Sequence, residues 1–280
     1  MNSPQTSESK RSPLTIYKLG TYVTLLLSAV IGLIAFLAFF ENDSRYFANS
    51  PVKIILYVIL ALSVLFALSS FFASKKIGKI EIAQKTPYSL SLIPTATAIA
   101  TFAIAATEIA KGDNSVISII MTISLLGVAL YYLADVLRFP KSAKIALGYV
   151  KIIFCVLLIS KLHLDFYVEL NSPIKLLTQF SAASAVLSTL SDLKILINRG
   201  SAGYFIFSKV CFLTISLLAS IGALTEVVCN LDKYGVDLLI YPIFFLSVAI
   251  PTAVKFFTAS ASPKTDEAPL PSNPTEKETE

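Results

Sequence analysis

The sequence contains no tryptophan, one histidine and three cysteines among its 280 residues. His163 alone cannot provide bis-histidine haem ligation or the usual histidine-rich metal sites, which need further imidazoles. The cysteines, Cys155, Cys211 and Cys229, have no CxxC spacing and lie in or beside apolar segments. Their odd number argues against a disulfide framework, so we interpret the thiols as packing groups. We therefore expect no cofactor and no metal.

Charged residues are scarce as well, at 15% of the chain, whereas 55% of the residues are hydrophobic and the mean hydropathy is +0.73. Ordinary soluble domains have about a quarter charged residues, so this composition predicts an integral membrane protein in a lipid bilayer. The net charge of +5 does not indicate a nucleic-acid partner, because the basic residues are spread over many short segments and form no single patch. We interpret this charge as a signal of membrane topology.

Eight apolar segments are long enough to cross a bilayer, which takes about 20 residues at about 1.5 Å each. They are residues 17–40, 51–73, 88–110, 116–137, 143–162, 173–197, 204–228 and 236–257. The fifth is the least secure, because Lys151 interrupts it. The fold class is therefore predicted to be an all-α polytopic bundle of about eight spans; loss of the fifth span would leave seven.

Basic residues between the segments predict the orientation. With the N-terminus inside, 14 Lys and Arg residues fall in inward segments and 6 in outward ones. This bias predicts cytoplasmic N- and C-termini, with residues 1–14 and 259–280 as flexible tails that are too polar to order themselves. The absence of tryptophan with abundant Ile, Lys and Phe is typical of an A/T-biased bacterial genome, which would place the chain in the cell membrane.

An internal similarity relates the two halves of the chain. Residues 43–55 align without a gap with residues 165–177, and five positions are identical, including an Asn-Ser-Pro box. Thr-Glu-Ile at 107–109 corresponds to Thr-Glu-Val at 225–227. We hypothesise a duplication of two four-helix repeats, residues 15–139 and 140–258, in the parallel arrangement of some transporters.

The Asn-Ser-Pro box has a local structural interpretation. Ser50 and Ser172 are suited to cap a helix, and the prolines that follow fit its first position. Lys53 and Lys175 are expected to extend to the outer head groups. We favour this helix-entry role over ligand binding.

Ionisable residues inside membrane spans are rare and costly, so each is a candidate for a substrate or ion pathway. These residues are Glu108, Glu226, Asp192, Asp135, Lys151 and Lys209. Glu108 and Glu226 are predicted near the outer boundary, and the other four in the inner half. Pairing of the inner acids and bases across helices, or extension of the lysines to the membrane surface, is the structural alternative.

Small residues follow helical spacing in the third, sixth and seventh segments, for example at Ser181, Ala185 and Ser188. Such faces allow helix backbones to approach closely, so these three segments are predicted to form the buried centre.

The sequence contains no motif that specifies a function. GxSxG, HExxH and Walker motifs are all absent, which disfavours an enzyme. The leading hypothesis is a small-solute or ion transporter-like protein, with Glu108 and Glu226 as outer gates and Asp192 as an inner coupling group. The alternatives are a non-catalytic scaffold or accessory subunit that binds another membrane protein or itself, and a membrane-embedded lipid-modifying enzyme.

Overall fold

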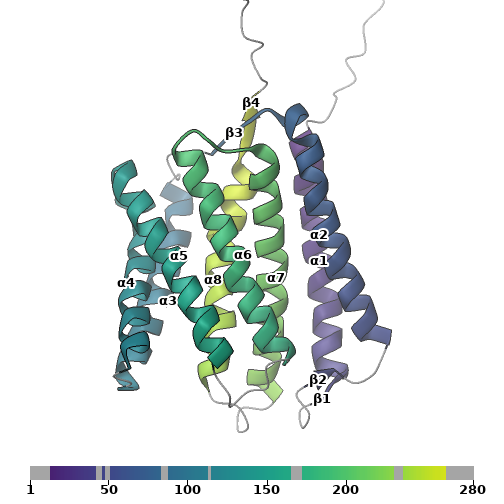
Figure 1. Ribbon diagram of the computed structural model, residues 1–280. Helices are drawn as coiled ribbons and strands as arrows, with labels where there is room; N and C mark the ends of the chain where they lie inside the picture. The colour runs from purple at the N-terminus through teal and green to yellow at the C-terminus, as the bar shows by residue number, and fades with distance from the viewer. Residues whose placement is uncertain are drawn as a thin grey trace, which may run out of the picture.

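The computed structural model describes residues 13–41, 46–47, 51–82, 88–112, 115–164, 172–229 and 236–262, and within these ranges it contains eight long helices standing side by side (Figure 1). The helices are α1 (Pro13–Ala38), α2 (Pro51–Ile77), α3 (Tyr88–Ala110), α4 (Val116–Val136), α5 (Lys141–Leu164), α6 (Pro173–Leu196), α7 (Ala202–Cys229) and α8 (Val236–Thr258). Two short antiparallel strand pairs accompany them: β1 (Phe40–Glu41) with β2 (Tyr46–Phe47), and β3 (Lys79–Glu81) with β4 (Ser260–Ser262). The predicted all-α polytopic bundle is confirmed.

Seven of the eight helices are long and apolar enough to cross a membrane. The helix containing Lys151, α5, is one of the seven, although the sequence made it the least secure. The exception is α6, which is rich in Ser and Thr and places Lys175, Thr178, Ser181 and Ser188 in buried positions. A helix whose polar side chains face other helices needs less apolar surface than one that faces lipid. At 24 residues, α6 is still long enough to cross.

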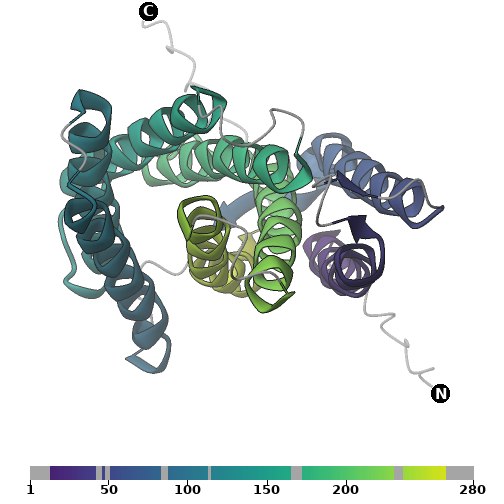
Figure 2. The same ribbon diagram turned by 90° about the horizontal axis from the view of Figure 1, so that it is seen from below.

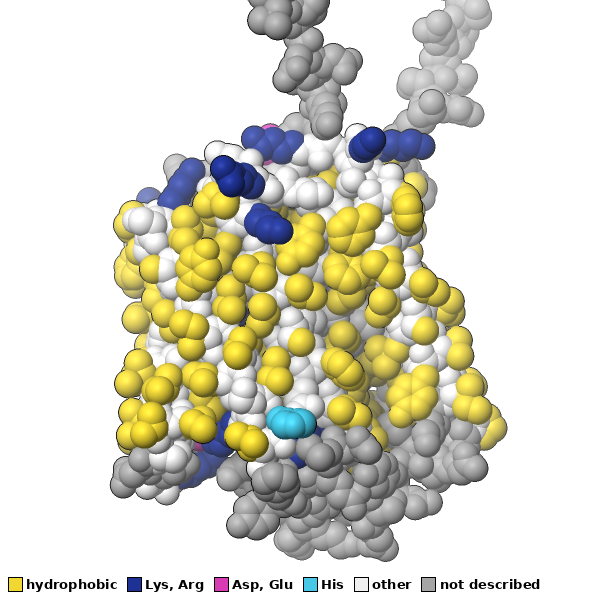
Figure 3. All heavy atoms as spheres, in the orientation of Figure 1, with side chains coloured by type: hydrophobic (Ala, Val, Ile, Leu, Met, Phe, Trp, Pro, Cys, Tyr) yellow, Lys and Arg dark blue, Asp and Glu magenta, His cyan; other side chains and the backbone are white. Residues whose placement is uncertain are grey.

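The outer surface of the bundle matches a lipid environment. Large apolar side chains are exposed along α1 and α2, with Phe72 90% exposed. Apolar atoms cover the middle of the face in Figure 3, whereas Lys and Arg gather mainly at one rim. A soluble protein would not expose so large an apolar area, so these helices indicate a multi-pass membrane protein.

At the centre of the bundle lies α7, which contacts α1, α2, α6 and α8. Helices α3 and α4 lie at the opposite edge from α1 and α2 and pack against α5 and α8 (Figure 2). The expected buried centre is thus found for α6 and α7 but is wrong for α3, which lies at the edge against α4 and α8. Among the described residues, α1 and α2 make no extensive contact with α3 or α4. The packing therefore gives the two predicted repeats no support as separate bundles, and the duplication stays a hypothesis.

Two helices approach closely where α2 passes the start of α7. Ser70 Oγ donates a hydrogen bond to the Gly203 carbonyl at 2.8 Å, in a fully buried position. A Cβ at Gly203 would lie 2.9 Å from the Phe71 Cα and the Ser70 carbonyl oxygen. Both obstacles are backbone atoms, so the contact between α2 and α7 depends on this glycine.

We expect Gly203→Ala to lower the free energy of unfolding by about 2 kcal/mol, because the two backbones must separate to admit the methyl group. Thermal unfolding of the purified protein in dodecyl maltoside measures this loss. Gly20→Ala is the matched control, since its Cβ would meet only the far end of the Phe66 ring, a side chain that can move. Equal losses in the two variants would contradict the importance of the backbone contact.

The two ends of the described chain meet at one face of the bundle. Strand β3, directly after α2, pairs with β4, directly after α8. Near the start of α1, Lys18 Nζ donates hydrogen bonds to the carbonyls of Phe257 and Ala259 at 2.8 and 2.6 Å. We call this end the β3/β4 face and the other the β1/β2 face. An even number of crossings brings both ends of a chain to one face, as eight helices do. Residues 260–262, predicted as flexible tail, instead pair with β3, and the remaining tail residues from 263 lie outside the described chain.

The predicted cytoplasmic orientation can be tested with cysteines placed at exposed ends of helices. We replace Cys155, Cys211 and Cys229 with alanine and introduce either His163→Cys at the end of α5 or Asn198→Cys after α6. An impermeant maleimide applied to intact cells is expected to label the first variant alone, because Asn198 lies at the β3/β4 face. Labelling of Asn198→Cys alone would reverse the orientation.

Candidate functional site

A cavity of about 730 Å³ lies at the β3/β4 face, between α8 and the ends of α3, α4, α5 and α6 at that face. Strand β3 and the segments that connect α4 to α5 and α6 to α7 border it. Its charged lining residues are Lys79, Glu81, Asp135, Arg138, Lys141, Lys144, Asp192 and Lys255. A cavity of this size can hold a small organic molecule.

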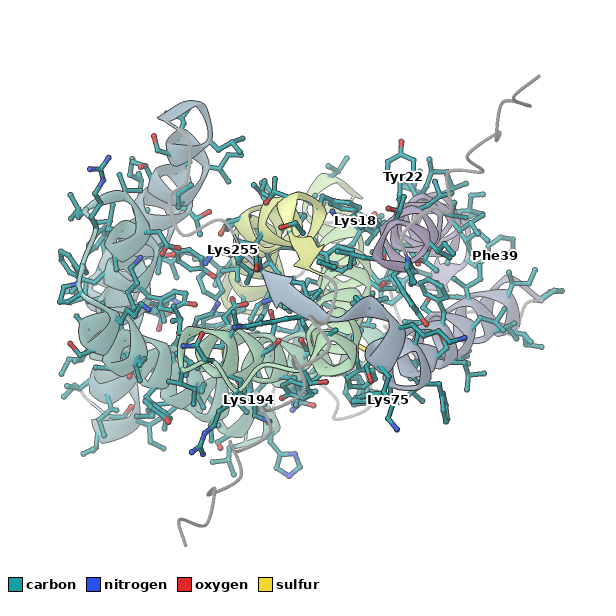
Figure 4. The ribbon with its side chains drawn as sticks, turned by 90° about the horizontal axis from the view of Figure 1, so that it is seen from above. Lys18, Tyr22, Phe39, Lys75, Lys194 and Lys255 are labelled. Carbon is teal, nitrogen blue, oxygen red and sulfur yellow. The ribbon has the colours of Figure 1, made fainter. Side chains whose placement is uncertain are left out.

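Asp135 is the centre of an ion triad at the cavity. Lys144 Nζ on α5 is 2.9 Å from Asp135 Oδ1, and Lys255 Nζ on α8 is 2.9 Å from Asp135 Oδ2. All three side chains are largely buried, with exposed fractions of 16% to 26%. One carboxylate thus connects α4, α5 and α8. In Figure 4 the side chain of Lys255 lies beside α8, toward the middle of the molecule.

Asp192 pairs with Lys209 across the α6–α7 contact. Lys209 Nζ is 2.6 Å from Asp192 Oδ1 and donates hydrogen bonds to Ser188 Oγ and to the Ser188 carbonyl at 2.8 and 3.1 Å. The lysine is fully buried, and Asp192 reaches the cavity. This is the predicted pairing across helices. Extension of Lys209 to the membrane surface, the other structural alternative, is wrong.

Lys151 is also buried, but an aromatic environment surrounds it. Its Nζ donates a hydrogen bond to the Tyr132 hydroxyl at 2.7 Å and lies 5.1 and 4.9 Å from the ring centres of Tyr131 and Tyr132. The Tyr131 ring also lies 5.7 Å from Lys255 Nζ. Aromatic faces attract ammonium groups, so Tyr131 links Lys151 to the triad. Among the described residues, no carboxylate forms an ion pair with Lys151.

These groups form one buried assembly, the lysine–aspartate cluster, which consists of Asp135, Lys144, Lys151, Asp192, Lys209 and Lys255. Sequence reasoning found four members but assigned Lys144 and Lys255 to inward loops as topology signals. For Lys144 the sequence does contain a pattern that indicates burial. Lys144, Gly148 and Lys151 follow the i, i+4, i+7 spacing of one helix face. Gly148 is buried against Leu193 of α6, so this face of α5 points into the bundle.

Glu108 lies at the opposite end of the bundle, away from the cavity. Its buried carboxylate is 2.6 Å from Lys111 Nζ and 3.2 Å from Lys161 Nζ on α5. The two lysines thus balance the charge of Glu108, the predicted outer gate, and the pair with Lys161 connects α3 to α5. Glu226, its predicted equivalent, is on α7, but its side chain lies outside the described residues.

The helix-entry role predicted for the Asn-Ser-Pro box is confirmed only in part. Pro173 begins α6 as predicted, whereas the Ser172 hydroxyl makes no capping hydrogen bond. Lys175 is fully buried, so its predicted extension to the head groups is wrong. Pro51 begins α2, and the other box residues of the first half, including Ser50 and the Lys53 side chain, lie outside the described residues.

The site offers charged lysine and aspartate side chains in ion pairs. The described residues contain no group of three or more His, Cys, Asp or Glu side chains that could hold a metal ion. The sequence matches no family model, and neither a curated protein nor a solved structure is similar to it. Functional interpretation therefore depends on the cavity and on the lysine–aspartate cluster.

Proposed function

We propose that this protein moves a small solute or ion across the membrane and binds it in the cavity at the β3/β4 face. The observation that carries the proposal is a cavity of about 730 Å³ with intramembrane carboxylates and lysines at its wall. Buried ionisable groups in membrane proteins usually mark a substrate or ion pathway. The scaffold hypothesis requires lipid-facing surfaces but no cavity of this kind.

The packing beyond the cavity resembles a closed outer gate. The Phe154 ring on α5 packs edge-on against Phe244 of α8, with ring centres 5.5 Å apart. Phe245 continues this layer toward Phe212 of α7, and all four rings are buried. Along α5 and α8, the aromatic layer lies between the cavity and the Glu108 ion triad. In this proposal the cavity is open at the β3/β4 face, and the aromatic layer closes the other end.

Helix α5 connects the two ends. Lys144 near its start pairs with Asp135 at the cavity, and Lys161 near its end pairs with Glu108. A movement of α5 would strain both ion pairs together, which is the coupling that alternating access requires. In this proposal Asp192, paired with Lys209 at the cavity wall, is the inner coupling group and Glu108 holds the outer gate closed.

Uptake into proteoliposomes tests the proposal. Purified protein is reconstituted in phosphatidylcholine vesicles, and uptake of rubidium, chloride, inorganic phosphate and decanoate is measured. We expect uptake of at least one probe above protein-free vesicles and a loss of about tenfold or more in Asp192→Asn. Lys194→Gln is the control, because this exposed lysine on the same helix does not line the cavity.

Two results would contradict the proposal. Uptake of all four probes equal to that of protein-free vesicles argues against transport. Full uptake in both Asp192→Asn and Glu108→Gln would show that the assigned residues play no part in it. Thermal unfolding of each variant, measured in parallel, separates loss of fold from loss of transport.

A further inference from the structure

The cavity has a surplus of positive charge. Among the residues that the structure describes, the lining includes five cationic side chains but only three carboxylates, Glu81, Asp135 and Asp192. Directly behind the wall lie two more lysines, Lys151 and Lys209, both buried. In their ordinary ionised forms, the described side chains in and directly behind the wall therefore amount to seven cations and three anions.

The surplus extends into the buried part of the site. Asp135 already shares its two oxygens between Lys144 and Lys255, and Asp192 is paired with Lys209. Lys151 has a phenol and two aromatic faces as its neighbours. A buried charge without a counter-charge is destabilising, and an anion bound nearby would reduce that penalty.

Lys144 and Lys255 are placed to bind such an anion. Both line the cavity, and both hold their ammonium groups against Asp135. An ammonium group has more donors than the one bond to Asp135 uses, so each can donate to a second acceptor. Lys79, Arg138 and Lys141 at the entrance would attract a negative ligand toward them.

Much of the remaining wall of the cavity is apolar, although Ser91, Asn198 and Thr258 also line it. Its lining includes Ile80, Leu90, Val136, Phe139, Ile195 and Val254. A smaller pocket of about 30 Å³ shares Leu90, Asp135, Val254 and Lys255 with the cavity and extends between α3, α4 and α8, past Pro94 and Pro251. The cavity lies at the β3/β4 face, at the ends of helices that are long and apolar enough to cross a membrane. An inorganic anion would leave this apolar surface without a partner.

We propose that the ligand of this cavity is an amphiphilic anion, with a phosphate or carboxylate group at Lys144 and Lys255 and an apolar body against Leu90, Phe139 and Val254. The inference rests on the cavity being the binding site of the proposed function. It adds the chemical class of the ligand: one charged head joined to a hydrocarbon portion.

Ligand-induced thermal stabilisation of the full chain in dodecyl maltoside tests this assignment. The probes are dodecyl phosphate, inorganic phosphate and dodecyltrimethylammonium. We expect dodecyl phosphate to raise the melting temperature by about 3 °C or more at saturation, and the other two probes to have no such effect. The first probe has the anionic head and the chain together, whereas each of the others lacks one of them.

Variants place the binding at the cavity. Lys255→Gln and Lys144→Gln are each expected to weaken the apparent affinity for dodecyl phosphate about tenfold, as loss of a charge-assisted hydrogen bond does. Lys255→Arg keeps the positive charge and is expected to keep the affinity for dodecyl phosphate. Its binding would show that the weaker affinity of Lys255→Gln comes from the lost charge and not from misfolding. Lys194→Gln is the matched control at the same end of the bundle; Figure 4 shows Lys194 on the outer side, away from Lys255.

The outcomes separate this inference from the proposed transport. Equal stabilisation by inorganic phosphate would make the ligand a soluble anion, and stabilisation by dodecyltrimethylammonium would exclude an anion site; either result overturns the inference. Unchanged dodecyl phosphate affinity in both glutamine variants overturns it as well. Binding without uptake of any probe would contradict transport alone, whereas rubidium uptake without dodecyl phosphate binding would contradict the ligand class alone.

Discussion

Replacement of Asp135 by asparagine is expected to lower the free energy of unfolding by about 3 kcal/mol. The carboxylate is the shared partner of Lys144 and Lys255, each 2.9 Å away, and connects three helices. Its removal leaves two ammonium groups close together in a largely buried region already rich in positive charge. Thermal unfolding and SDS-induced unfolding of the purified protein measure the loss.

Two controls define the cause of that loss. Lys194→Gln removes an exposed charge at the same face, whose ammonium group lies 4.4 Å from the Tyr204 ring centre, and is expected to change stability by less than about 1 kcal/mol. Asp135→Glu keeps the negative charge and is expected to retain most of the stability. A loss below about 1 kcal/mol in Asp135→Asn would mean that the triad contributes little to holding α4, α5 and α8 together.

Replacement of Lys209 by methionine is expected to be the other severe change, with a loss of about 4 kcal/mol. Lys209 is fully buried, and Asp192, its partner at 2.6 Å, has a side chain only 14% exposed. The methionine leaves this carboxylate without its cation between α6 and α7. Neutralising both members, in the double variant Lys209→Met/Asp192→Asn, is expected to recover the stability to within about 1 kcal/mol, because no unpaired charge remains.

The same double variant separates structural pairing from a coupling role. If Asp192 only balances Lys209, the double variant recovers both stability and proteoliposome uptake. If Asp192 couples transport, as we propose, stability returns and uptake does not. The measurement therefore decides between the two interpretations that the intramembrane charges allow. Failure of the double variant to recover stability would contradict the pairing itself.

The membrane class, the positions of the spans and the number of helices followed from the sequence. These properties depend on runs of about 20 apolar residues, which are local along the chain. Even α5 was found, because its four lysines are spread along the helix and leave a stretch with a mean hydropathy of 2.1. Glu108, Asp135, Asp192 and the buried lysines of α5 and α7 could be singled out in the same way, since an ionisable residue inside an apolar run is visible without a fold, whereas the side chain of Glu226 lies outside the described residues.

The partners of those residues were decided by the tertiary structure. Lys144 and Lys255 lie near helix ends, where the sequence favours a loop role, and only the rotation of α5 and α8 brings both to Asp135. The burial of Lys175 follows from the packing around α6, which no local pattern reports. Hydropathy depends on neighbours along the chain, whereas an ion pair or a cavity wall depends on which helices lie side by side. The sequence by itself therefore determined that this chain crosses the membrane repeatedly, and the helix packing determined where its buried charges meet.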